Sequence, residues 1–175
     1  MIIQLTGLSG AGKSTIAKIV KSKLESLQYK VEIIDGDDYR ETICSDLGFS
    51  KEDRIENIKR LGYIAKVLSN HKIIVLLAAI APYESSRKFV KNLVLKNEYK
   101  EVYIECSLEE LKNRDVKGLY ARALLPESDI YEKPENPDYI IITDEEIEEQ
   151  SGASLSYHII EWHIKAYGKR EPLFY

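Results

Sequence analysis

Short, continuously apolar runs recur along the chain, and between them lie longer segments in which apolar and charged residues mix. Apolar runs without polar alternation are typical of parallel strands that helices cover on both faces. They predict strands at residues 2–5, 31–34, 73–80, 102–104 and 139–142. The segments between and after them predict helices at residues 13–27, 53–70, 84–96, 108–114 and 154–167. Alternating strands and helices predict an α/β fold of three layers with a mostly parallel central sheet.

Two segments near the carboxyl end complete this pattern. Residues 115–137 are charged and contain proline, and they predict a lid loop beside the ligand. The helix expected at 154–167 has Leu155, Ile159, Trp162 and Ala166 on one face, as a helix packed on the sheet would. The 175 residues are within the usual size of one domain, so we expect a single domain over residues 1–175.

Charge and hydropathy narrow the classes of partner. A net charge of −4 and a pI near 5.5 argue against general affinity for nucleic acid or anionic membrane. The longest apolar stretch, residues 73–81, is much shorter than the roughly 18 to 20 residues that cross a bilayer. We therefore expect a cytoplasmic protein that holds any anionic ligand with a local group of basic side chains.

A phosphate-binding loop follows the first predicted strand and opens the first predicted helix. The motif G-x-x-x-x-G-K-[ST] is matched by Gly7-Leu8-Ser9-Gly10-Ala11-Gly12-Lys13-Ser14. In such a loop, backbone N–H groups and the positive end of the helix surround the phosphates. Lys13 would bridge the β and γ phosphates, and the Ser14 hydroxyl would ligate Mg²⁺. The motif predicts a P-loop NTPase fold that binds a nucleoside triphosphate with Mg²⁺.

Two carboxylates follow the second predicted strand. Asp35 and Asp37 flank Gly36 where the carboxyl ends of parallel strands form the ligand crevice. One carboxylate there can accept the proton of an attacking hydroxyl, and the other can hold Mg²⁺ through water or orient the acceptor. Both are candidate catalytic residues, and Asp35 is, with Ser14, the candidate metal ligand.

Basic and amide side chains follow within twenty-odd residues. Arg54, Asn57 and Arg60 are spaced by three on a predicted helix, and Arg40 precedes them. Guanidinium groups grip phosphate or sulfate with paired hydrogen bonds, so the group predicts an acceptor that carries its own oxyanion.

With these residues in view, the chain resembles the adenylylsulfate kinases, which use MgATP to phosphorylate the ribose 3′-hydroxyl of adenosine 5′-phosphosulfate (APS). The resemblance rests on the loop through Thr15, on Asp35-Gly36-Asp37 with Arg40, on Leu47-Gly48-Phe49-Ser50, on Asp53-Arg54 with Glu56-Asn57-Ile58 and Arg60, on Ala81-Pro82-Tyr83, and on Arg114-Asp115 with Lys117-Gly118-Leu119-Tyr120. Before the final strand, Tyr131-Glu132 and Pro134-Glu135-Asn136-Pro137 are also similar to the family's segment. It implies that Asp37, Arg40, Arg54 and Asn57 bind the acceptor and that Phe49 stacks on its base. It further implies that Arg114, Lys117 and Leu119 belong to the lid near both nucleotides, and that the protein can form a homodimer.

Two departures from the family pattern bear on the reaction. Ala81 stands where many members have a serine that can carry a phosphoryl group, so we expect direct in-line transfer from ATP to the acceptor. Residues 121–130 are shorter than the family's segment and lack its phenylalanine, which would close over the adenine. Because aromatic stacking is worth about 1 to 3 kcal/mol per base, a related reaction on cytidine diphosphoramidate, used in capsule polysaccharide modification, is an alternative.

Other classes with this loop fit less well. A GTPase needs an Asn-Lys-x-Asp tetrad after a later strand, and the sequence has none. An inactive regulatory relative would be expected to lose Lys13, Ser14, Asp35 or Asp37, all of which are present. The sequence therefore favours a phosphotransferase with an alcohol group as acceptor.

Overall fold

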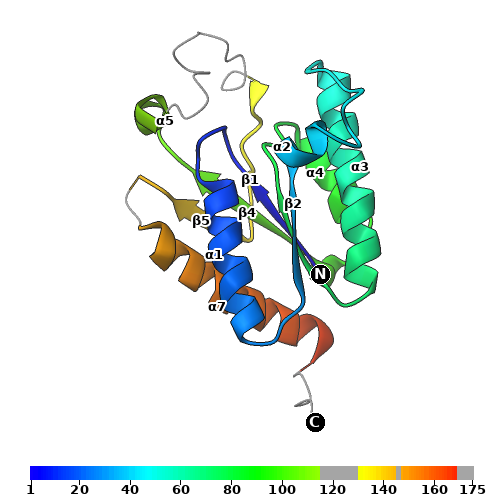
Figure 1. Cartoon of the computed structure of the whole chain (residues 1–175), viewed down its shortest axis with the longest axis vertical. Coiled ribbons are helices and arrows are strands. Elements are labelled where there is room, and N and C mark those ends of the chain that lie inside the picture. The colour runs from blue at the N-terminus through cyan, green and yellow to red at the C-terminus, as the bar shows by residue number, and fades with distance from the viewer. Residues whose placement is uncertain (115–129, 145–146, 169–175) are drawn as a thin grey trace.

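The computed structural model describes residues 1–114, 130–144 and 147–168, and its centre is a five-stranded sheet with helices on both faces (Figure 1). The strands are β1 (Ile2–Thr6), β2 (Val31–Asp35), β3 (Ile74–Ala78), β4 (Tyr99–Glu105) and β5 (Tyr139–Ile142). Their order is β2-β3-β1-β4-β5, and each pairing within this sheet is parallel. The three-layer α/β fold expected from the sequence is confirmed.

In the part of the chain that the structure describes, helices cover both faces of the sheet. The helices are α1 (Lys13–Ser26), α2 (Gly36–Arg40), α3 (Lys51–Asn70), α4 (Glu84–Lys91), α5 (Leu108–Arg114) and α7 (Glu148–Tyr167), with a 3₁₀ turn η1 (Lys96–Glu98) before β4. α1 packs against α7 on one face, and α3 packs against α4 on the other. Among the described helices, none combines the length and the apolar character needed to cross a membrane.

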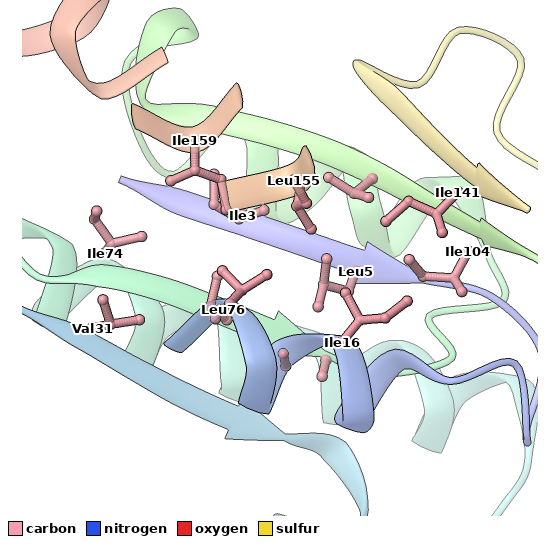
Figure 2. Close-up of a cluster of buried hydrophobic side chains, with 14 of the residues drawn as sticks. Ile3, Leu5, Ile16, Val31, Ile74, Leu76, Ile104, Ile141, Leu155 and Ile159 are labelled. Carbon is pink, nitrogen blue, oxygen red and sulfur yellow. The ribbon is translucent and has the colours of Figure 1, made fainter. Parts of the chain in front are cut away.

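Each face has its own buried cluster. Figure 2 shows one of them, in which Ile3 and Leu5 of β1 meet Ile16 of α1 and Leu155 and Ile159 of α7. Alternate residues of the same strand point to the other side, where Ile2 packs with α3 and α4 residues such as Leu61 and Val90. The side chains on both faces of β1 are buried, which explains why its sequence is a nearly continuous apolar run.

The element boundaries differ from the expected ones in several places. β4, expected at 102–104, runs from Tyr99 to Glu105, because Tyr99 and the charged residues after it also pair with β1. The helix expected at 84–96 ends at Lys91. Leu95, the residue before η1, donates its backbone N–H to the carboxylate of Glu98, so the chain forms a separate 3₁₀ turn there instead of continuing the helix. The strand expected at 73–80 ends at Ala78, where the chain turns toward the ligand cavity. α7 begins at Glu148, six residues before the expected start at 154. The apolar pattern missed its first turns because the residues that face α1 there are small, such as Gly152, and not large and apolar.

Gly152 lies where α7 packs tightly against α1. A Cβ atom placed there would lie 2.4 Å from Cγ2 and 2.9 Å from Cβ of Ile19, on a helix that also packs against β1, β2 and β3. We expect Gly152→Val to lower the free energy of unfolding by about 2 to 3 kcal/mol, as measured by urea denaturation. Ala153→Val places the same side chain on the exposed neighbouring position and should cost only about 0.5 kcal/mol through helix propensity. Equal losses in the two variants would contradict the packing account.

Candidate active site

One cavity of about 590 Å³ lies at the carboxyl ends of β2 and β3 and at the loop that follows β1. Its lining includes most of the predicted site residues, namely Ser9, Gly10, Gly12, Lys13, Ser14, Thr15, Asp35, Asp37, Arg40, Phe49, Arg54, Asn57, Ala81 and Arg114. Parallel strands bring these residues together because their carboxyl ends meet at one edge of the sheet.

The loop between β1 and α1 has the conformation expected of a phosphate-binding loop. Gly12, the residue before α1, has a φ of 98°, which L side chains rarely adopt. Gly7 is buried against β4, where an added Cβ would lie 2.3 Å from the Ile104 carbonyl oxygen. Lys13 Nζ folds back over the loop and donates to the carbonyl oxygens of Gly7 (2.8 Å) and Leu8 (2.7 Å). Gly7 and Ala11 therefore shape the loop from the core side and do not line the cavity.

Asp35 links the loop to the second strand. Its Oδ2 accepts a hydrogen bond from Ser14 Oγ (2.5 Å), and its Oδ1 accepts one from the backbone N–H of Asp37 (3.0 Å) and so caps α2. The carboxylate of Asp35 is therefore held on the loop side of the cavity. Asp37 lies in the first turn of α2, is exposed, and lines the cavity beyond it.

Two guanidinium groups lie close to one aromatic ring. The Cζ atoms of Arg40 and Arg54 lie 4.6 and 5.4 Å from the ring centroid of Phe49, whose side chain is 68% exposed. Arg40 Nη1 donates to Gly48 O, and Arg54 Nε donates to Phe49 O, both at 2.9 Å. The pKa of Arg40 is lowered, first because partial burial disfavours its charged form and second because the like charge of Arg54 lies nearby. An oxyanion bound between them would relieve that repulsion.

Asn57 is buried beside Arg54 on α3, with an exposed fraction of 4%. Its Oδ1 atom has no hydrogen-bond partner within the described ranges, although it lines the cavity. Buried polar atoms are nearly always paired in native proteins. Asn57 therefore brings an open hydrogen-bond acceptor to the cavity wall.

Arg60, which the helical spacing grouped with Arg54 and Asn57, belongs elsewhere. It makes an ion pair with Asp46 through Nη1 at 2.6 Å and Nη2 at 2.9 Å, and its Nε pairs with Glu56 at 3.2 Å. It is not among the described residues that line the cavity. The grouping was wrong for Arg60, because steps of three residues do not stay on one face of a helix with about 3.6 residues per turn. The Arg60 side chain therefore points toward the loop before α3. Lys117 and Leu119 lie outside the described residues.

Some residues that line the cavity were not predicted as site residues from the sequence. The wall at the end of β3 consists of Ala78, the last residue of the strand, and of Ala79, Ile80, Ala81 and Pro82 after it; of these, only Ala81 was expected as a site residue. The rule that placed Asp35 at a strand end would also have found this wall. Glu148 at the start of α7 also lines the cavity, and its Oε1 is near Gly12. Nothing in the run of glutamates around it distinguishes it in the sequence.

Arg114, at the end of α5, lies at the loop side of the cavity. Its Nη2 donates to Thr143 O (2.7 Å), and its Nε donates to Glu110 Oε1 (2.8 Å). The Thr143 methyl group in turn lies 3.7 Å from the position of a Cβ on Gly12. This arrangement places one cation near the phosphate-binding loop.

Comparison with known proteins gives one consistent result. The family model for adenylylsulphate kinase matches residues 1–142. The adenylyl-sulfate kinase of Acaryochloris marina is 45% identical over 152 residues, which are 83% of this chain and 74% of that protein. The one from Halothermothrix orenii is 42% identical over 166 residues, which are 91% and 89% of the two chains.

A solved structure agrees in fold as well as in sequence. The APS kinase CysC of Mycobacterium tuberculosis, in complex with AMPPNP and APS, superposes with a TM-score of 0.81 at 32% identity. The match covers 92% of this chain and 95% of that one. Adenylyl-sulfate kinases are phosphotransferases that act on a hydroxyl group, so the expected enzyme class is confirmed and the inactive-module alternative is not supported. The cytidine diphosphoramidate and capsule alternative finds no support in these comparisons. By its sequence and its fold, this chain belongs to the adenylylsulphate kinase family.

Proposed function

We propose that this protein transfers the γ-phosphoryl group of ATP to the ribose 3′-hydroxyl of APS by direct in-line displacement. The observation that carries the proposal is that one cavity joins a phosphate-binding loop to a second group of oxyanion-binding residues, Arg40, Arg54 and Asn57. The relative from Mycobacterium tuberculosis, which holds AMPPNP and APS together, supports two nucleotide sites in one cavity.

The donor half of the cavity is formed by the loop and the start of α1. Backbone N–H groups and the helix end would hold the phosphates of ATP, and Lys13 would exchange its loop carbonyl partners for the β and γ phosphate oxygens. Arg114 adds a second positive charge on this side. In the transition state, these charges stabilise the negative charge on the transferred group.

Ser14 and Asp35 fit a Mg²⁺ site that completes this half. A hydroxyl and a carboxylate that already touch each other are the hard oxygen donors that Mg²⁺ prefers, together with waters and phosphate oxygens. Mg²⁺ bound there would neutralise charge on the β and γ phosphates. Because Asp35 is held by Ser14, we assign the metal role to Asp35 and leave Asp37 for the acceptor.

The acceptor half lies between α2 and the first turns of α3. Arg40 and Arg54 would hold the phosphosulfate, Asn57 would donate or accept one hydrogen bond, and the exposed ring of Phe49 would stack on the adenine. Asp37 would accept the proton of the 3′-hydroxyl as its oxygen attacks the γ phosphorus and the bond to ADP breaks. The Ala81 side chain has no hydroxyl that could carry the phosphoryl group, so the transfer has one step.

The proposal is tested by measuring ADP release in the presence of MgATP with APS, with AMP, or with no acceptor. We expect turnover to depend on APS, because AMP lacks the sulfate that the arginines would hold, and we expect mass spectrometry to find the 3′-phosphorylated product. ADP release at the same rate without APS would mean simple ATP hydrolysis and would reject the proposed acceptor. The homodimer and the cytoplasmic location stay predictions.

A further inference from the structure

A buried arginine lies directly behind the acceptor wall of the cavity. Arg87 of α4 is 2% exposed and is not among the described residues that line the cavity. Its guanidinium makes three hydrogen bonds, from Nε to Glu101 Oε1 (2.7 Å), from Nη1 to Ala81 O (2.8 Å) and from Nη2 to Glu132 O (2.7 Å). One side chain thus joins α4, β4, the wall after β3, and the segment of residues 130–138 that leads into β5.

The hydrogen bond from Arg87 Nη1 to Ala81 O is made to a residue with an unfavourable backbone conformation. Ala81 has a φ of 45°, in the left-handed region that residues with a Cβ avoid, and it is 1% exposed. Such conformations persist where the surroundings hold them and are found mostly at functional sites. The Ala81 carbonyl receives its hydrogen bond from Arg87, so the conformation of the wall depends on this guanidinium.

Glu132 is fastened to the same wall by its other groups. Its backbone N–H donates to Pro82 O (2.8 Å), and its carboxylate accepts from the Glu84 N–H (2.6 Å). Beside it, the Tyr131 hydroxyl lies 2.8 Å from Thr6 Oγ1, which donates to Ile80 O. Residues 131–132 therefore lie along residues 80–84, and Arg87 is at the centre of this contact.

The wall adjoins the acceptor half of the cavity. Ala81 packs in the same buried cluster as Ile58 of α3, the helix that carries Arg54 and Asn57, whereas Ala11 of the phosphate-binding loop belongs to the cluster on the other face. Lys51 at the start of α3 lies over the ring of Tyr83, with Nζ 5.2 Å from the centroid. A shift of the wall would therefore change the acceptor half more than the donor half.

We propose that Arg87 is a positioning residue for the acceptor: it sets the acceptor side of the cavity by holding the Ala81 wall and by docking residues 131–132 behind it. This inference rests on the proposed function, because it names a determinant of the same site. Arg87 would act through other residues, because its buried side chain is not among the described residues that line the cavity.

The test uses variants that separate positioning from loss of fold. Removing Arg87 alone leaves the Glu101 carboxylate without its ion pair, which can unfold the protein. The double variant Arg87→Met/Glu101→Gln removes both charges and the hydrogen bonds to the wall. Arg87→Lys keeps a positive charge opposite Glu101 but lacks the planar guanidinium that donates to Glu101, Ala81 and Glu132 at once. Lys100→Met is the matched control, because the Lys100–Asp138 ion pair (2.6 Å) also joins β4 to the 130–138 segment but has no bond to Ala81.

Two measurements are made on each variant. In the double variant we expect the KM for APS to rise by about tenfold or more while the KM for MgATP changes by less than about twofold. Arg87→Lys should lie between it and the wild type, and Lys100→Met should match the wild type. Hydrogen exchange should be faster at the Glu84 and Glu132 amides of the double variant, and unchanged at Val75 inside the sheet.

The outcomes separate this inference from the proposed function. Unchanged exchange at Glu84 and Glu132, or equal rises in both KM values, would overturn the positioning role. A wild type that does not phosphorylate APS, with exchange changed in the double variant, would reject the proposed function and leave the docking role of Arg87 in place.

Discussion

Lys13→Ala is expected to lower kcat/KM by at least ~100-fold, which corresponds to about 2.7 kcal/mol of transition-state stabilisation. The reason is that Lys13 directly follows the phosphate-binding loop and folds back over it, with its Nζ at the carbonyl oxygens of Gly7 and Leu8. Steady-state measurement of APS-dependent ADP release checks the result. Most of the loss should be in kcat, because Lys13 would stabilise the charge that develops on the leaving phosphate oxygens as the bond to ADP breaks, which exists in the transition state and not in the bound substrate.

Lys18→Ala is the control for this variant. Lys18 is on the same helix, α1, and its side chain is exposed, so its removal should change kcat/KM by less than about twofold. A thermal melt of both variants separates loss of catalysis from loss of fold. Near-normal turnover by Lys13→Ala would remove the loop lysine from the mechanism.

Arg54→Ala has the second largest expected effect, and it should divide the two substrates. We expect the KM for APS to rise about 10- to 100-fold, because a charged group that holds an oxyanion contributes about 1.5 to 3 kcal/mol. The variant also frees the Phe49 carbonyl, to which Arg54 Nε donates, and so loosens the ring expected to stack on the base. The KM for MgATP should change by less than about threefold, because Arg54 is on the acceptor side.

Arg60→Ala is the matched control, since Arg60 is on the same helix but pairs with Asp46 and Glu56. It should change the KM for APS by less than about threefold. A rise of similar size in both KM values with Arg54→Ala would place this residue on the ATP side instead.

The local patterns in the sequence were sufficient for the fold and for the loop. Continuous apolar runs such as that of β1 predict buried parallel strands, because a strand covered on both faces has no polar side. The glycines and Lys13 of the loop were readable because their spacing follows from the shape of a phosphate group. Asp35 and Asp37 were placed by topology alone, since all strand ends of a parallel sheet meet at one edge.

Residues whose role depends on distant partners were not readable in this way. Arg60 shares the helical spacing of Arg54 and Asn57, yet its charge is paired with Asp46, which lies in the loop before α3. Glu148 comes to the cavity only because α7 packs beside α1, through the small residues around Gly152. Spacing along one helix says which residues are neighbours on it, and it says nothing of what lies opposite.

The α/β class, the phosphate-binding loop and the family were readable from the chain, because they depend on local periodicity and on motifs with a fixed geometry. Three features came only from the folded molecule: which cations face the cavity, the left-handed backbone of Ala81, and its hydrogen bond from Arg87. The physical reason is that these features arise from contacts between segments far apart in the chain, such as Arg87 with Glu132, and no local pattern records such a pair.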